Sequence, residues 1–189
     1  MAALTWLAVP GDAGAWAALG FAVDGGGINV GRVRCTIDDR GWGFDEIHSD
    51  PCDLGVRTVT QPAAAPATHP CGVTAIDHVV YTVRDLDFSV EVLNAVLGAQ
   101  PRRRFHPRGP QGPEMAFYRA GEAVIEVVAD GREPALIGLA LKCADLDGAV
   151  SHIRSCGGPI SDPRPAVQGG RIASVWSGHL NWGLAIMGR

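Results

Sequence analysis

The sequence predicts an α+β protein with two consecutive units, each made of a strand, a helix and three further strands. The stretch AIDHVVYTVRDLDFSV (75–90) is followed by the similar LIGLALKCADLDGAV (136–150), and their DLD triplets lie 60 residues apart. An apolar run precedes each triplet, and a helical pattern of apolar residues follows it. A repeated strand, turn and helix therefore organises the C-terminal two thirds of the chain.

Each copy opens with a strand that leads into a capped helix. Residues 76–83 and 136–143 form apolar runs bounded by polar residues, which is typical of a strand buried on both or nearly both faces. An aspartate begins each helix and a glycine, Gly98 or Gly158, ends it. The spacing of the helical apolar stripe predicts that four side chains are buried: Val90, Leu93, Val150 and Ile153.

Three short strands follow each helix. The first copy offers residues 100–105, 114–119 and 123–128, separated by HPRGPQGP and AGE. The second copy offers residues 159–162, 170–176 and 183–187, separated by PRPAVQG and SGHLN. Each unit is thus a βαβββ module, and the two modules span residues 73–130 and 135–189.

The N-terminal residues 1–59 form a weaker, degenerate unit of the same kind. A strand at 4–9, a helix at 12–19 and strands within 28–37 and 41–47 are expected, without a DLD triplet. Any strand-helix-strand segment would look similar. Residues 60–72 (TQPAAAPATHPCG) are rich in proline and alanine and predict an extended linker. Because strand edges need cover, we expect residues 1–50 to pack on the C-terminal sheet or on a second chain in a homodimer.

Composition excludes several classes of partner. The chain has 189 residues, 47% apolar and 19% charged, with a net charge of −4, so neither nucleic acid nor an anionic membrane is expected as a partner. The N-terminal apolar segment lacks a basic region and stops at Pro10, and no other run approaches a membrane span. Five scattered cysteines without a CxxC pair indicate reduced thiols in a cytoplasmic protein.

The C-terminal modules resemble the vicinal oxygen chelate superfamily, which has the glyoxalase, bleomycin-resistance and extradiol dioxygenase fold. The resemblance covers about residues 73–188 and rests on IDHVVYTVRDLDFSVEVL, on AVIEVV and on the tandem layout. It implies that the two modules form a cup-shaped mixed sheet. It also implies a divalent metal inside the cup, held by side chains from the first and fourth strands and acting as a Lewis acid on two neighbouring substrate oxygens.

The resemblance implies that His78 and Glu126 are metal ligands. Both are polar residues in apolar strands, where an unpaired buried charge would be costly. They could equally hydrogen-bond each other or face solvent. The 60-residue offset places Gly138 where His78 stands, and aligning VIEVV with GLAIM places Ala185 opposite Glu126. We therefore expect a divalent metal (zinc, nickel, manganese or iron) to bind weakly or not at all.

Two classes of function follow from the resemblance, and no catalytic residue is assigned. The first is a protein that binds a small molecule in its cup, with Phe117, Trp176 and Trp182 as aromatic lining and Arg104, from PRRRFHPRG, as an anion clamp. Core packing and a charged strand edge explain these residues equally well. The second is a metal-dependent lyase or isomerase of the glyoxalase type that uses His78 and Glu126. An extradiol dioxygenase is disfavoured, because it needs a second histidine.

Overall fold

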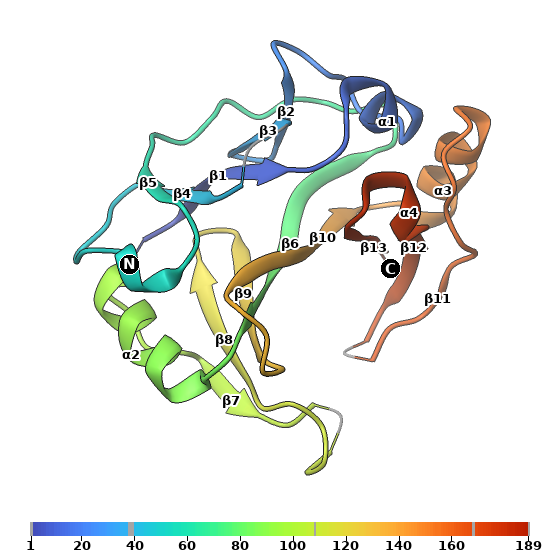
Figure 1. The fold of residues 1–189 in the computed structure, drawn as a ribbon. Coiled ribbons are helices and arrows are strands. Elements are labelled where there is room, and N and C mark those ends of the chain that lie inside the picture. The colour runs from blue at the N-terminus through green and yellow to red at the C-terminus, as the bar shows by residue number, and fades with distance from the viewer. Residues whose placement is uncertain (1, 38–39, 108, 168, 189) are drawn as a thin grey trace.

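The computed structural model describes residues 2–37, 40–107, 109–167 and 169–188, and they form two β-sheets with helices on their surfaces (Figure 1). The larger sheet has eight strands in the order β11-β12-β13-β10-β6-β9-β8-β7. Its strands are β6 (Val73–Val83), β7 (Arg103–Phe105), β8 (Met115–Ala120), β9 (Ala123–Ala129), β10 (Ala135–Cys143), β11 (Arg164–Pro165), β12 (Arg171–Val175) and β13 (Gly183–Gly188). The predicted α+β architecture of two βαβββ modules is confirmed.

The two modules meet along an antiparallel pair of strands and are related by a pseudo-twofold axis. His78 on β6 pairs with Ala140 on β10, and Gly138 on β10 pairs with Val80 on β6. Position 78 plus 60 is 138, and position 140 minus 60 is 80, so the 60-residue offset converts the first pair into the second. The hydrogen-bond register therefore reproduces the 60-residue offset that the sequence shows.

Helices α2 (Leu86–Leu97) and α3 (Leu146–Ser155) follow the first strand of each module, as predicted. Asp85 accepts a hydrogen bond from the Phe88 backbone N–H, and Asp145 accepts one from Gly148, so each helix has a side-chain cap. All four apolar side chains predicted to be buried are buried. One detail was wrong: α3 ends at Ser155, and Gly157, rather than Gly158, follows it with a left-handed φ of 86°.

The strands after each helix agree less closely with the sequence prediction. In the first module β8 and β9 match within one residue, whereas β7 has only three residues. In the second module the first of the three strands was misplaced, because β11 lies inside the expected PRPAVQG turn and residues 159–162 contribute only a single bridge at Ile160. The expected SGHLN turn is a short helix, α4 (Ser177–Leu180).

The smaller sheet has five strands in the order β2-β3-β1-β4-β5. They are β1 (Leu4–Val9), β2 (Gly27–Val30), β3 (Val33–Ile37), β4 (Trp42–Phe44) and β5 (Thr58–Thr60), with helix α1 (Ala13–Ala18) after β1 and a 3₁₀ turn, η1 (Cys52–Leu54), before β5. Strands β3-β1-β4-β5 alternate parallel, antiparallel and parallel, as β9-β6-β10-β13 do in the larger sheet. The assignment of residues 1–59 as a degenerate module remains a prediction.

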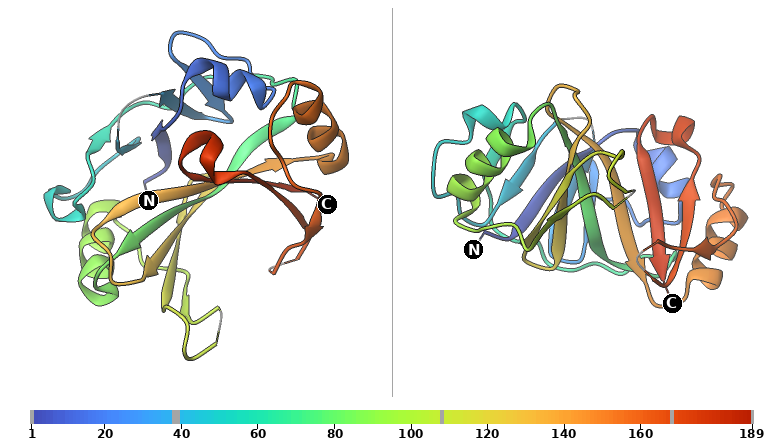
Figure 2. Two further views of the ribbon diagram at one scale, coloured as in Figure 1. Left: turned by 45° about the vertical axis from the view of Figure 1, so that its right-hand side comes forward. Right: turned by 90° about the horizontal axis from the view of Figure 1, so that it is seen from below.

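The N-terminal sheet packs on the convex face of the larger sheet, between α2 and α3 (Figure 2). The Tyr81 hydroxyl donates a hydrogen bond to the Leu54 carbonyl, and the Tyr81 ring lies 4.9 Å from that of Trp42. This is the first of the two arrangements expected for residues 1–50. The proline- and alanine-rich segment is extended and docked along the small sheet, where buried His69 contacts the Ala22 N–H and the Asn29 carbonyl.

Within the described residues, no helix is both long and apolar enough to span a membrane.

Candidate functional site

The concave face of the larger sheet carries the two residues that the resemblance implied as ligands. His78 on β6 pairs with Val124 on β9, and Glu126 on β9 pairs with Val80, so both side chains project from the face opposite the helices. His78 Nε2 lies 3.9 Å from Glu126 Oε2, and both side chains are about one fifth exposed (23% and 18%). The structure therefore brings these two residues together although 48 positions separate them in the sequence.

A β-bulge places a third polar side chain beside them. Ala140 pairs with His78 and Leu141 pairs with Ile76, so Asp77 is an extra residue on β6 with no partner position on β10. A bulge turns two successive side chains toward the same face, and Asp77 Oδ2 accordingly lies 2.8 Å from His78 Nδ1. A regular strand would have directed Asp77 into the core behind the sheet.

A lysine of the second module completes this polar row. Lys142 Nζ on β10 lies 3.2 Å from Asp77 Oδ1. The hydrogen bond from His78 lowers the pKa of Asp77, partial burial opposes this shift, and Lys142 reinforces it. Because the ionised carboxylate only accepts hydrogen bonds, His78 Nδ1 carries the proton, and Nε2 is the ring nitrogen turned toward Glu126. We call Lys142, Asp77, His78 and Glu126 the polar row.

The second module offers small residues at the corresponding places. In the second module Gly138 takes the place of His78, and it pairs with Gly183. Ala140 takes the place of Val80, and its partner Ala185 takes the place of Glu126. The register thus makes Ala185 the counterpart of Glu126, as the alignment of VIEVV with GLAIM suggested. Opposite the polar row, the concave face carries side chains no larger than a methyl group at these four positions.

The residues present do not fit the resident metal that the resemblance implies. In the described segments, no group of three or more His, Cys, Asp or Glu side chains is arranged to hold a metal ion. The distance of 3.9 Å between His78 Nε2 and Glu126 Oε2 would admit one ion with two bonds of about 2.1 Å. Two ligands are too few, because structural zinc sites use four protein ligands and catalytic zinc sites use three. Asp77 is committed to His78 Nδ1, and Gly138 and Ala185 offer no donor atom.

Phe117 lies on the concave face next to Glu126, its cross-strand partner. It lines a pocket of about 540 Å³ with Phe105, Val124, Arg103 and Arg119. The Phe105 and Phe117 rings are stacked, with centroids 5.3 Å apart and an interplanar angle of 24°. This placement agrees with the predicted role of Phe117 in lining a binding cup, a role that stays a prediction.

Arg104 points away from this pocket. Its guanidinium contacts Asp87 at the start of α2 and Glu114 before β8, at 2.6 and 2.7 Å. The neighbouring Arg103 pairs with Phe117 and so shares its face, because strand side chains alternate. The structure thus places Arg103, and not Arg104, toward the concave face, and it gives Arg104 a role in fastening α2 to β7.

The two predicted tryptophans also lie apart from the polar row. Trp182 is buried, donates its indole N–H to the Leu136 carbonyl, and lines a wide cleft between the N-terminal unit and the second module. Trp176 directly precedes α4 and is 67% exposed. Neither is among the residues that line the Phe117 pocket.

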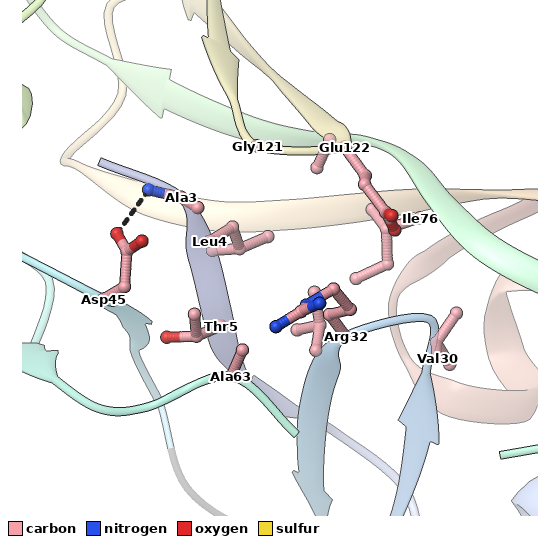
Figure 3. A pocket seen from close by; sticks show the side chains of 12 residues that line it. Ala3, Leu4, Thr5, Val30, Arg32, Asp45, Ala63, Ile76, Gly121 and Glu122 are labelled. Atoms are coloured by element: carbon pink, nitrogen blue, oxygen red, sulfur yellow. Dashed lines mark hydrogen bonds between the residues drawn. The ribbon is translucent and has the colours of Figure 1, made fainter. Parts of the chain in front are cut away.

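A smaller cavity of about 290 Å³ lies on the convex side, between the N-terminal sheet and β6 (Figure 3). Arg32 points into it, and Leu4 and Ile76 contribute apolar walls. Asp45 at its rim accepts a hydrogen bond from the Ala3 backbone N–H. None of the predicted site residues lines this cavity.

Three residues that the structure places at or beside the site were not predicted from the sequence: Asp77, Lys142 and Arg119. Arg103 and Phe105 were considered only as part of the run PRRRFHPRG, from which Arg104 was chosen. Asp77 left a readable signal, because it is a second polar residue next to His78 within an apolar run. Lys142 and Arg119 depend on strand register and left none.

Comparison with known proteins assigns this architecture to a family. A model of the Glyoxalase/Bleomycin resistance protein/Dioxygenase superfamily matches residues 75–177. No curated protein matches the chain.

Solved structures with a similar fold include methylmalonyl-CoA epimerase from Mycobacterium tuberculosis, with a TM-score of 0.52 and 24% identity over 62% of this chain and 89% of that one. The enzyme from Streptomyces coelicolor in complex with 2-nitronate-propionyl-CoA gives a TM-score of 0.49 and 20% identity, over 61% and 97% of the two chains. A hypothetical protein from Bacillus halodurans C-125 gives 0.49 and 15%, over 60% and 93%. At these identities the similarity concerns the fold alone.

Proposed function

Since the chain belongs to the Glyoxalase/Bleomycin resistance protein/Dioxygenase superfamily, we propose that it binds a small molecule on the concave face of its eight-stranded sheet. The polar row is the single observation that carries this proposal. Four ionisable side chains lie on one face of three adjacent strands, with contacts of 3.2, 2.8 and 3.9 Å between successive members. Asp77, His78 and Glu126 are each about a quarter exposed or less, and a partly buried cluster of ionisable side chains at the centre of a sheet is a candidate for a ligand site.

The surroundings of the polar row support a ligand site. Phe105 and Phe117 supply an apolar wall on the side of the first module. Gly138, Gly183 and Ala185 leave space beside the polar row on the side of the second module. Apolar walls around a few convergent polar groups are typical of small-molecule sites.

A screen of metabolites by thermal shift, followed by calorimetry, tests this proposal. A ligand of the concave face should lose at least about tenfold in affinity in His78→Ala and in Glu126→Gln, because each variant removes one polar contact. Arg154→Gln is the matched control, since Arg154 on α3 pairs with Asp162 away from this face. Ligands that bind both site variants as tightly as the parent protein would contradict the proposal.

The second candidate is a lyase or isomerase that moves a proton, and the 2.8 Å contact between Asp77 and His78 favours it. Asp77 orients the imidazole through Nδ1, so Nε2 can accept a proton from a substrate carbon next to a carbonyl group. Glu126 Oε2 lies 3.9 Å from Nε2, so a small approach of the two side chains would let Glu126 receive or return that proton. Methylmalonyl-CoA, the ligand named for a structural neighbour, is a first compound to test.

Proton exchange measures this activity directly. Incubation in deuterium oxide should incorporate deuterium at the carbon next to the thioester carbonyl, and His78→Ala should abolish the incorporation. Asp77→Asn should keep ligand affinity but slow the exchange, because the orienting carboxylate is lost. Exchange that continues in His78→Ala would assign the base elsewhere.

A further inference from the structure

The pocket beside the polar row gathers arginines without carboxylates. Arg102, Arg103 and Arg119 line it together with Phe105 and Phe117, and no Asp or Glu is among the lining residues. The chain as a whole carries an excess of four negative charges, so its carboxylates are abundant elsewhere. The local charge therefore has the opposite sign to that of the whole protein.

These three arginines differ from six of the other ten arginines that the structure describes. Among the described residues, none of the three takes part in an ion pair. Six other arginines each contact a carboxylate: Arg34 with Asp24, Arg84 with Glu133, Arg104 with Asp87 and Glu114, Arg132 with Asp130, Arg154 with Asp162, and Arg171 with Asp147. Arg103 pairs with Phe117, and Arg119 lies two residues along β8 from Phe117, so these two cations share one face and repel each other; an anion between them would relieve that repulsion.

Protection of a strand edge accounts for only part of this arrangement. Charged residues on an edge strand discourage pairing with another chain, and β7 is the edge of the sheet. Arg119 lies on β8 two residues beyond Phe117, where the pairing with β7 ends, so it too stands at an open edge and pairs only with Val124 on β9. Phe105 on β7 is 39% exposed, and an exposed aromatic ring would favour association. The combination is better suited to a ligand that has both an anionic group and an apolar part.

The register relates this pocket to the polar row. Val124 pairs with His78 on one side and with Arg119 on the other, so these three residues form one row across β6, β9 and β8. Neighbouring strands are about 4.8 Å apart, which puts the backbone of Arg119 about 10 Å from that of His78. A molecule only slightly longer than a benzene ring with one substituent spans that distance.

We infer that this pocket binds the anionic end of the ligand: Arg103 and Arg119 hold a carboxylate or phosphate group, and the stacked Phe105 and Phe117 rings hold an adjoining apolar or planar segment. The inference rests on the proposed function only in placing the other end of the same ligand at His78 and Glu126. A volume of about 540 Å³ is within the range of small-molecule pockets. Guanidinium groups bind carboxylate and phosphate oxygens through paired, charge-assisted hydrogen bonds.

Three aromatic probes of similar size test the inference: phenyl phosphate, benzoate and neutral benzamide, titrated into the full chain and followed by NMR chemical shifts. Both anions should bind at least about tenfold more tightly than benzamide, and higher salt should weaken only the anions. Arg103→Gln and Arg119→Gln should each remove at least about tenfold of that preference. The stronger anion identifies the ligand group as carboxylate or phosphate.

Arg171→Gln is the control. Arg171 lies on β12, the strand of the second module that corresponds to β8, and it already pairs with Asp147. This variant should bind all three probes as the parent protein does. Equal affinity for benzoate, phenyl phosphate and benzamide, or an equal loss in Arg171→Gln, would overturn the inference. So would tight binding of a single-stranded oligonucleotide without binding of phenyl phosphate, because it would indicate a nucleic-acid surface.

His78→Ala separates this inference from the proposed function. The probes are too small to depend on His78, so their affinity and their dependence on Arg103 should persist in that variant. If metabolite ligands depend on His78 while the anionic probes fail to bind, the pocket assignment is wrong and the proposed function stands. If the probes bind through the arginines while no ligand depends on His78, the reverse holds.

Discussion

The two modules share a scaffold but differ in chemistry. Each has its bulge at the corresponding place: Asp77 is the extra residue on β6, and Ile137, 60 positions later, is the extra residue on β10. The first module has a carboxylate there, followed by His78, whereas the second has an isoleucine followed by Gly138. The two modules therefore have a bulge at the same position of the repeat but carry different side chains there, and the functional groups are found at these differences.

The largest expected effect concerns what the modules share. Leu93 in α2 and Ile153 in α3 are both fully buried against the sheet. Replacing either with alanine should lower the free energy of unfolding by about 2–5 kcal/mol, because each change leaves a cavity in a packed core. Urea denaturation measures both. If one of the two variants lost less than about 1 kcal/mol of unfolding free energy while the other lost the expected amount, the two helices would not contribute equally to stability.

The next prediction removes the chemical difference. Gly138→His with Ala185→Glu supplies the second module with the residues that stand at His78 and Glu126. Four ligands in place of two should raise zinc affinity by at least about a hundredfold over the parent protein. Calorimetry measures this change. A Cβ at Gly138 would lie 3.1 Å from the Gly183 carbonyl oxygen, so a small backbone adjustment is required.

Ala185→Glu alone is the control for that crowding. It should give an intermediate zinc affinity with an unchanged unfolding midpoint. The opposing outcome is that the parent protein binds zinc tightly and still does so as His78→Ala. That result would contradict the proposed difference between the modules, because the metal would then lie away from His78.

A smaller, pH-dependent effect concerns one ion pair in each module: Arg171 with Asp147 at the start of α3, and Arg104 with Glu114 before β8. Arg171 lowers the pKa of Asp147, and Arg104 lowers that of Glu114. A carboxyl whose folded pKa is depressed adds stability above its unfolded pKa of about 4, and this stability is lost as pH falls through the folded value. Arg171→Gln and Arg104→Gln should therefore differ from the parent protein at pH 6 and much less at pH 3. Urea midpoints that differ equally at both pH values would be inconsistent with these pairs.

The smallest effect uses cysteines as reporters of the second module, since residues 73–130 contain none. Cys156 at the end of α3 is exposed, whereas Cys143 at the end of β10 is buried, and burial raises the pKa of its thiol. Native protein at pH 8 should be labelled by a thiol reagent at Cys156 much faster than at Cys143. Peptide mass mapping of the labelled sites gives the answer, and equal rates would indicate that the helix detaches readily from the sheet.

The sequence predicted the repeat well because strand, cap and helix each leave a local pattern. The capping aspartates Asp85 and Asp145 and the buried stripe through Leu93 and Ile153 depend only on nearby residues. His78 and Glu126 were identified through the resemblance to a family. That they meet on one face follows from the pairing of β6 with β9, which joins segments more than 40 residues apart.

The errors have a common physical origin in strand register. Arg103 and Arg104 are neighbours in sequence and face opposite sides of the sheet, so a choice between them requires the pairing of β7 with β8. The misplaced strand of the second module is short and has few apolar residues, so no periodic pattern marks it. Asp77 reaches the concave face only because of a bulge, and an alternating pattern would have assigned it to the opposite side.

The bulge on β6 also has a consequence for how this site can vary. Without residue 77, Ile76 and His78 would still face Leu141 and Ala140, which are consecutive on β10, so the ladder would close regularly. Position 77 is thus an insertion whose side chain can change without displacing any core residue. The same holds for position 137 in the second module. Positions 77 and 137 are therefore places where natural variation or directed evolution can add or remove a functional group beside the site and leave the rest of the sheet unchanged.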